Sequence, residues 1–282
     1  MKKILVPTDF SKQAEYALDA AIQIATTMDA TIILLHVVEN PAASSFQITG
    51  EMVYYDHSTD EFLSNVKKKA AVSLKDMVDA RVGAKVEIEK EVLVGLPFIH
   101  FSELIAERNV DLVVMGSKGT NTFADMIVGS NTEKMVRYAK CPVITVKSEF
   151  EIGNVQNIVY ATNFEEKEDM VLGRISSLQE YLNATLHLLW VHTPHVLISE
   201  DEISEKLNGM VLKYNLKNYV LSVKRSVFVD KGILEYAANR GIDMIAMSTH
   251  GRRGLAHLFT GSIAEEVVNE GPQPIWTFSM HG

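Results

Sequence analysis

Two glycine-rich stretches of this sequence have the residue types and spacing of a phosphate-binding loop. The first, residues 116–131, reads GSKGTNTFADMIVGSN, and the second, residues 248–263, reads STHGRRGLAHLFTGSI. Each follows an apolar run and precedes a segment of helical character. Glycines let backbone N–H groups approach an anion closely, and a helix N-terminus adds unpaired donors and a positive dipole end. A surface loop with ordinary turn glycines is the alternative, because short glycine motifs recur by chance.

The second stretch favours phosphate binding, because it belongs to a repeat of the whole chain. The repeat aligns Gly119 with Gly251, Gly129-Ser130 with Gly261-Ser262 and Pro142 with Pro274. A repeat of this length predicts two domains of about 140 residues each. We place them at residues 1–148 and 155–282, joined by a short polar linker.

The first loop has the pattern G-x2-G-x9-G-[ST], which Gly116, Gly119, Gly129 and Ser130 match in full. With the ILVPTD segment at residues 4–9 and LLHV at 34–37, this pattern resembles the universal stress protein family. The chain therefore resembles a tandem universal stress protein. The resemblance implies an α/β fold with two doubly wound, five-stranded parallel sheets, which are Rossmann-like and of the adenine nucleotide alpha hydrolase type.

The resemblance also implies a ligand, ATP or another adenine nucleotide, and its site. In the first domain the implied contacts are Pro7, Thr8, Asp9, Val37, Met115, Gly116, Lys118, Gly119, Gly129, Ser130 and Asn131. Asp9 is the candidate ligand of Mg²⁺ or of a ribose hydroxyl. In the second domain the corresponding, weaker site comprises Thr162, Asn163, Val191, Ser248, Gly251, Arg252, Gly261 and Ser262.

The elements that must position these residues alternate along the chain. Apolar runs and helical spacing predict strands in the first domain at 4–6, 31–38, 85–94, 110–115 and 143–146, with helices between them. In the second domain they predict strands at 158–160, 185–191, 221–229, 242–247 and 275–278. Such alternation predicts a parallel sheet whose ligands lie beyond the strand carboxyl ends, where the strand order reverses. If the first and fourth strands are neighbours there, Asp9 and the glycine loop converge.

The two domains are not chemically equal. Asn163 stands where the first domain has Asp9, Ser248 where it has Gly116, and Trp190 where it has His36. These changes remove a carboxylate, add a side chain in the glycine loop and place a larger side chain on one wall of the second nucleotide crevice. Lys118, Arg252 and Arg253 could pair with phosphate, although solvated loop charge is the simpler reading. We expect the first domain to bind nucleotide and the second to bind weakly or not at all.

Composition limits the other classes of function. The chain has 282 residues, a hydrophobic content of 47% and a net charge of −9. The negative charge argues against nucleic acid or an anionic membrane as a partner. One cysteine, Cys141, suits a reducing compartment, and no apolar run approaches the length of a membrane span. The N-terminus enters a strand at once, so we expect no signal peptide and a cytoplasmic location.

The remaining features support no enzyme class. His187, His192 and His195 lack a cysteine or carboxylate that would complete a metal site, and loop or strand histidines explain them better. No nucleophile, metalloprotease or Walker A signature occurs. A scaffold that binds a partner or apolar ligand is the second hypothesis, and a slow ATPase the third. We expect the strands at 143–146 and 275–278 to meet in an intramolecular pseudo-dimer, with a homodimer as a further assembly.

Overall fold

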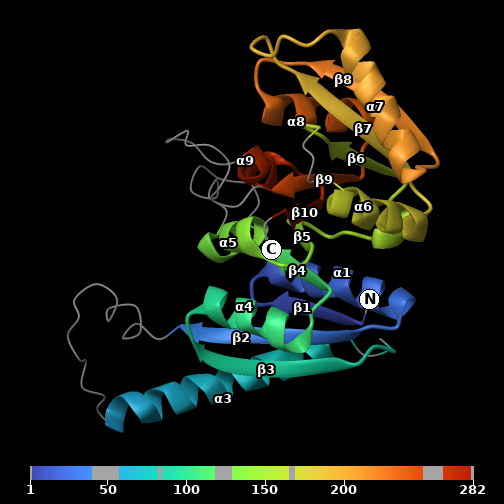
Figure 1. Ribbon diagram of the computed structural model, residues 1–282. Helices are drawn as coiled ribbons and strands as arrows, with labels where there is room; N and C mark the ends of the chain where they lie inside the picture. The colour runs from blue at the N-terminus through green and yellow to red at the C-terminus, as the bar shows by residue number, and fades with distance from the viewer. Residues whose placement is uncertain are drawn as a thin grey trace. The chain divides into compact units, whose positions relative to one another are not determined.

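The computed structural model of this chain describes residues 2–39, 57–81, 83, 85–117, 129–164, 169–249 and 263–280, with the backbone alone described at 57–60 and 169. The chain divides into two compact units, which we call the N-terminal unit (residues 1–116) and the C-terminal unit (residues 117–282). Both units alternate strands and helices (Figure 1). The α/β class expected from the sequence is therefore confirmed.

The N-terminal unit is a parallel sheet with the strand order β3-β2-β1-β4 (Figure 1). Helix α1 packs on β1, β2 and β4, whereas α3 packs on β2 and β3. The elements are β1 (Lys3–Pro7), α1 (Lys12–Met28), β2 (Thr31–Glu39), α3 (His57–Asp79), β3 (Ile88–Gly95), α4 (Pro97–Arg108) and β4 (Leu112–Gly116).

The two central strands of this unit are apolar on both faces because helices cover both sides of the sheet. Ile4, Leu5 and Val6 on β1 are fully buried, as are Ile33 and Leu34 on β2. Continuous apolar runs of this kind are expected in parallel sheets, where neither face meets water. Helix α1 begins at the Ser11 cap and ends at Asp29, which takes a left-handed conformation with a φ of 50°.

The C-terminal unit contains a sheet with the order β5-β10-β9-β6-β7-β8. Its strands β6 to β10 reproduce the second repeat as five parallel neighbours. The elements are α5 (Ser130–Tyr138), β5 (Val143–Val146), the 3-10 helix η1 (Ile152–Asn154), β6 (Asn157–Ala161), α6 (Asp169–Leu182), β7 (Thr185–His192), α7 (Glu200–Tyr214), β8 (Tyr219–Arg225), α8 (Val229–Arg240), β9 (Met244–Thr249), α9 (Ile263–Glu270) and β10 (Ile275–Ser279).

The sixth strand of this sheet, β5, belongs by sequence to the first repeat and pairs with β10 in antiparallel orientation. Two buried threonines reinforce the pair: Thr145 donates to the Ile275 carbonyl and Thr277 to the Val143 carbonyl, each at 3.4 Å. The two strands that we expected to meet therefore do pair. Because β5 pairs with β10, its residues belong by contact to the C-terminal unit, although they belong by sequence to the first repeat.

Most predicted strands agree with the observed ones to within two residues at each end, whereas two differ by three or four residues at one end. The strand expected at 85–94 is β3, Ile88–Gly95. The strand expected at 221–229 is β8, which ends at Arg225, where its partner β7 also ends. Val227 and Phe228 extended the apolar run in the sequence, but their side chains are 62% and 64% exposed. Within the described ranges, no helix combines the length and apolar character needed to span a membrane.

At Gly116, at the end of β4, packing leaves no room for a side chain, and a substitution there tests the fold. A Cβ atom there would lie 2.6 Å from the carbonyl carbon and 2.7 Å from the carbonyl oxygen of Gln13 on α1. Gly116→Ala should therefore lower the free energy of unfolding by about 1–3 kcal/mol, because a backbone has to move. Urea unfolding measures this, with Gly153→Ala as control, since a Cβ at Gly153 meets nothing within 4 Å. Equal stability of the two variants would contradict the packing argument.

Candidate functional site

The residues predicted for the first site from the N-terminal unit converge at one edge of its sheet. Strand β1 pairs in parallel with β2 on one side and with β4 on the other. The first and fourth strands are thus neighbours, as the sequence required for a shared crevice. The strand order reverses at β1, which is where ligands of doubly wound sheets bind. The predicted residues at these three strand ends are Pro7, Thr8, Asp9, Val37, Met115 and Gly116.

The turn after β1 is held by the Thr8 hydroxyl. The Thr8 backbone N–H donates to the Leu35 carbonyl at 2.9 Å, which continues the pairing with β2. Its side-chain Oγ1 accepts from the Phe10 backbone N–H at 3.0 Å and donates to the Met77 sulfur at 3.6 Å. Phe10 has a φ of 65°, a conformation that non-glycine residues rarely adopt. Backbone strain of this kind clusters at functional sites, where the surrounding structure holds it in place.

Asp9 is the exposed residue of this turn. Its Oδ1 accepts from the Ser11 backbone N–H at 3.0 Å, and the Ser11 hydroxyl accepts from the Ala14 backbone N–H at 3.3 Å. Ser11 is therefore the N-cap residue of α1, whereas Asp9 orders the turn before it. A carboxylate has lone pairs beyond the one bond seen here, so Asp9 can accept further hydrogen bonds or bind a cation.

His36 closes the turn on the side of β2. Its Nδ1 lies 2.8 Å from the Thr8 carbonyl oxygen. Because a carbonyl only accepts, Nδ1 carries the proton, which leaves Nε2 as the acceptor of the neutral ring. The ring centroids of His36 and Phe10 are 4.4 Å apart, so the strained turn packs directly against β2.

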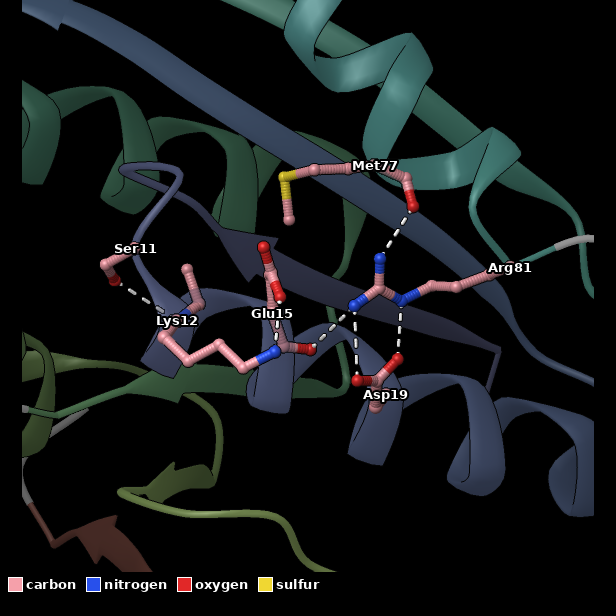
Figure 2. Close-up of polar contacts among 7 residues, drawn as sticks. Ser11, Lys12, Glu15, Asp19, Met77 and Arg81 are labelled. Carbon is pink, nitrogen blue, oxygen red and sulfur yellow. Dashed lines mark hydrogen bonds and ion pairs between the residues drawn. The ribbon is translucent and has the colours of Figure 1, made fainter.

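The C-terminal end of α3 is tied to α1 through Arg81 (Figure 2). The guanidinium forms a bidentate pair with Asp19 and donates to the carbonyl oxygens of Met77 at 2.7 Å and Glu15 at 3.3 Å. The Arg81 side chain is only 15% exposed, which strengthens such a pair relative to one at the surface. This cluster holds Met77 where its sulfur meets Thr8.

The second repeat contains a copy of the same turn after β6. The Thr162 hydroxyl accepts from the Phe164 backbone N–H at 3.0 Å and donates to the Met210 sulfur at 3.8 Å. The Thr162 backbone N–H donates to the Leu189 carbonyl, and Phe164 has a φ of 61°. Strands β7, β6 and β9 are again neighbours, so the predicted residues Thr162, Asn163, Val191 and Ser248 gather at one sheet edge.

The copy differs at the position of His36. Trp190 stacks face to face on Phe164, with centroids 4.3 Å apart and planes 10° apart, and the Lys206 ammonium lies 5.6 Å from the Phe164 ring centre. The Trp190 indole nitrogen is buried and has no hydrogen-bond partner within the described ranges. The flat stack fills the space beside the strand ends with aromatic surface. Asn163, in place of Asp9, is exposed.

The glycine loops themselves lie largely outside the described residues. This holds for Lys118 and Gly119 of the first loop, and for Gly251, Arg252, Gly261 and Ser262 of the second, together with Arg253. The end of the first loop is described: Gly129 is the N-cap of α5, followed by Ser130 and Asn131 in its first turn. The strand-loop-helix order predicted from the sequence holds at this end.

The histidines that we discounted as metal ligands have other roles. His192 Nε2 lies 3.0 Å from the Val196 carbonyl oxygen, so it stabilises the loop after β7. His187 is buried, with 8% exposure, and contacts Tyr236 and Asn157. Among the residues that the structure describes, no cluster of three histidine, cysteine, aspartate or glutamate side chains could hold a metal ion.

Sequence reasoning missed three residues of the first site, namely Phe10, Met77 and Arg81. Phe10 left a signal, because TDF at residues 8–10 recurs as TNF at 162–164. Met77 and Arg81 left none, since methionines and arginines on a helix usually serve packing and solvation. Only the contacts with Thr8 and Asp19 reveal their part in positioning the turn.

Comparison with known proteins agrees with this geometry. A model of the universal stress protein family matches residues 1–147 and 154–278. Universal stress protein YxiE of Bacillus subtilis is 30% identical over 145 residues, which are 51% of this chain and 98% of YxiE. Universal stress protein MJ0577 of Methanocaldococcus jannaschii is 30% identical over 155 residues, which are 52% of this chain and 94% of that protein.

The crystal structure of a universal stress protein from Archaeoglobus fulgidus matches the fold with a TM-score of 0.75. The match covers 99% of this chain and 98% of that chain at 20% sequence identity. The fold is thus a doubly wound α/β fold repeated along one polypeptide. This chain belongs to the universal stress protein family, whose model it matches twice.

The paired threonine turns give a prediction for this site. Thr8→Val and Thr162→Val each remove a hydroxyl that accepts from a backbone N–H at 3.0 Å. Each should lower the free energy of unfolding by about 1–3 kcal/mol, because an N–H at a strained residue loses its partner. Thermal and urea unfolding measure this. Thr26→Val, at an exposed hydroxyl on α1, is the control, and two site variants as stable as this control would show that the hydroxyls do not hold the turns.

Proposed function

We propose that the first repeat binds an adenine nucleotide, ATP with Mg²⁺, at the carboxyl edge of β1 and β4. One observation supports this most directly: β1 and β4 are adjacent parallel strands, with Asp9 after one and Gly116 at the end of the other. The reversal of strand order at this position favours a ligand crevice. Asp9 is the acceptor for a ribose hydroxyl or the ligand of Mg²⁺, and Val37 borders the crevice on β2.

The glycine loop that follows β4 is the proposed phosphate-binding element. Lys118 supplies a cation, and Gly119 and Gly129 leave room for the phosphates, with Ser130 and Asn131 as further donors. The two glycines whose surroundings the structure describes play different roles. The backbone of α1 lies against Gly116 and leaves no room for a side chain. Packing alone therefore explains glycine at this position, without a ligand.

Gly129 is the more informative glycine for ligand binding. A Cβ there meets nothing within 4 Å among the described residues, and its φ of −56° suits any amino acid. Neither packing nor backbone conformation therefore requires glycine at the N-cap of α5, where serine, asparagine or aspartate would stabilise the helix better than glycine. A close approach by a phosphate group accounts for it.

The second repeat is proposed as a weak site or none. Asn163 removes the charge of Asp9, and the stacked pair of Phe164 and Trp190 occupies the side of the crevice that His36 borders in the first repeat. Losing one charge-assisted contact typically costs about 1.5–3 kcal/mol, or roughly ten- to a hundredfold in affinity. We further propose that the protein has a regulatory or stress-response role in the cytoplasm, exercised when the first repeat holds a nucleotide.

Gly129→Ala tests the phosphate position without disturbing the fold. Alanine should leave the free energy of unfolding unchanged, because its methyl group would meet none of the described residues within 4 Å. It should weaken ATP binding in the presence of Mg²⁺ about tenfold or more by calorimetry, since the methyl group occupies the path of a phosphate. Gly173→Ala, also in open space on α6, is the control and should bind as the wild type does. Undiminished affinity in Gly129→Ala would remove this residue from the site.

Asp9→Asn tests the asymmetry of the repeats, because it makes the first turn resemble the second. The amide oxygen can still accept from the Ser11 N–H, so the turn and the fold should persist. Calorimetry should show about one nucleotide per wild-type chain, and roughly ten- to a hundredfold weaker binding in the variant.

The matched control for this experiment is Asp76→Asn, an exposed carboxylate on α3 that makes the same change of net charge. It should leave the affinity unchanged. Two equal, tight sites per chain would show that the substitutions at Asn163 and Trp190 have been misread.

A further inference from the structure

A pocket lies within the C-terminal unit, and its lining contains none of the residues of the weak nucleotide site predicted for the second repeat. It has a volume of about 370 Å³ and is bordered by the outermost strand β8 and the helix α8. The lining residues that matter here are Leu221, Ser222, Val223, Tyr236, Asn239 and Arg240. These residues give the pocket hydrogen-bond donors from the Arg240 guanidinium, the Asn239 amide and the backbone of β8.

The backbone of β8 supplies the first donors. The Asn218 carbonyl accepts from Leu186 and the Ser226 N–H donates to His192, so the even-numbered residues between them face β7. Leu221 and Val223 therefore direct their N–H and C=O groups away from β7, on the free edge that borders the pocket. An edge strand with unsatisfied backbone groups is a ready binding surface.

Arg240 supplies the positive charge. Its guanidinium lies 5.9 Å from the ring centre of Tyr236 and forms no ion pair with any described residue. The neighbouring Lys224 is already neutralised, because its ammonium lies 2.9 Å from the Glu235 carboxylate. The pocket thus has one uncompensated cation, the Asn239 amide and outward backbone N–H groups, which together suit an anionic oxygen.

A chain of buried hydrogen bonds leads inward from this pocket. Ser222 Oγ lies 2.7 Å from Tyr236 Oη, which lies 2.9 Å from His187 Nδ1. His187 Nε2 in turn lies 3.3 Å from the Asn157 carboxamide oxygen. Tyr236 and His187 are 6% and 8% exposed, so the pocket end of the chain is Ser222.

The direction of each bond follows from the Asn157 oxygen, which only accepts. His187 Nε2 therefore carries the proton of the neutral ring, and Nδ1 accepts from the Tyr236 hydroxyl. The Tyr236 oxygen then accepts from Ser222, whose only proton points inward. Ser222 in this state offers lone pairs to the pocket, which an anion would meet unfavourably.

Protonation of His187 reverses the chain. An imidazolium donates from both nitrogens, so Nε2–H still donates to Asn157 while Nδ1–H donates to Tyr236. The Tyr236 hydroxyl then donates to Ser222, and the Ser222 hydroxyl turns outward as a donor. A proton from solvent binds to Ser222 Oγ, the former Ser222 proton passes to Tyr236 Oη, and the former Tyr236 proton passes to His187 Nδ1. Two O–H bonds break, two O–H bonds and one N–H bond form, and the net result is one proton gained by His187 and one donor presented by Ser222.

We propose that this pocket binds a small oxyanion, and that each anion bound is accompanied by one proton taken up at His187 through Tyr236 and Ser222. The ligand class is a sulfate, phosphate or carboxylate group, held by Arg240, Asn239 and the edge of β8. The site would make this half of the protein responsive to anion concentration and pH together, whether or not the first repeat holds a nucleotide.

The charges around His187 agree with this coupling. Burial, and then the positive charge of Arg240, lower the pKa of His187, so the ring is neutral at neutral pH. A bound anion offsets the field of Arg240 and raises that pKa again. The elements around the network also carry the pair Lys224 and Glu235, Arg225 paired with Glu200, Asp230, and Lys231 paired with Glu270. Asp243, just before β9, accepts from the Asn157 backbone N–H.

Sulfate is the probe for the test, because its charge is constant over the range in which histidine titrates. Nitrogen NMR of the full chain follows the His187 ring, assigned with a His187→Gln variant, as pH is varied with and without sulfate. Saturating sulfate should raise the pKa of His187. Between the pKa of His187 without sulfate and the raised pKa with sulfate, the affinity for sulfate should fall by up to about tenfold per pH unit, because binding is then accompanied by uptake of one proton.

Three variants separate the parts of the proposal. Arg240→Ala should abolish sulfate binding, whereas Arg225→Ala, which removes the same charge from a residue paired with Glu200, should not. Tyr236→Phe and Ser222→Ala cut the chain while keeping Arg240, so their sulfate affinity should lose most of its pH dependence. A His187 pKa that sulfate leaves unchanged, or equal sulfate binding by Arg240→Ala and Arg225→Ala, would overturn the proposal.

Discussion

The hydrogen bond from the Phe10 backbone N–H to the Thr8 hydroxyl is the contact on which the candidate site depends. It holds Phe10 in a left-handed conformation, and this turns the chain sharply between β1 and α1. The sharp turn leaves Asp9 exposed at the strand end and brings Ser11 into position as the helix cap. Helix α1 then lies so close to β4 that only glycine fits at 116. One side-chain acceptor thus supports both the exposure of Asp9 and the packing of α1 against β4.

The second repeat shows which parts of this arrangement are scaffold and which are ligand chemistry. Threonine, the strained phenylalanine and the methionine sulfur are all present in both turns. The carboxylate at position 9 and the imidazole at position 36 are not, since Asn163 and Trp190 replace them. A turn that survives the loss of its exposed carboxylate is maintained by its own geometry. Beyond its bond to the Ser11 N–H, the Asp9 carboxylate has lone pairs that can bind an external ligand.

Much of the fold was predictable from the sequence because apolar runs and turn residues are local signals. The strands at 4–6, 31–38 and 185–191 follow from pattern alone and are observed as β1, β2 and β7. The end of β8 was not predictable, because Val227 and Phe228 look like strand residues and only the length of β7 stops the pairing. Solvent-exposed apolar residues of this kind mislead any reading by pattern.

The site was predictable at the level of strand ends but not of contacts. Asp9 and Gly116 could be placed at one edge because parallel strands end together. Three contacts depend on residues far apart in sequence. Gly116 packs against the backbone of α1, Arg81 pairs with Asp19, and His187 contacts Tyr236, which contacts Ser222. Such pairings are decided by tertiary packing and leave no trace in spacing.

The pairing of β5 with β10 can form only after the last strand of the chain has left the ribosome. Thr145 and its carbonyl partner on Ile275 are 130 positions apart, so β5 emerges long before the strand that completes its edge. Through that interval β5 presents an open edge of apolar residues, which is the feature that makes growing chains vulnerable to association. The exposed edge of β5, in the first repeat, is covered only once the second repeat has been synthesised and β10 can pair with it. Because the two repeats are joined in one polypeptide, every chain that carries a β5 strand also carries the β10 strand that pairs with it.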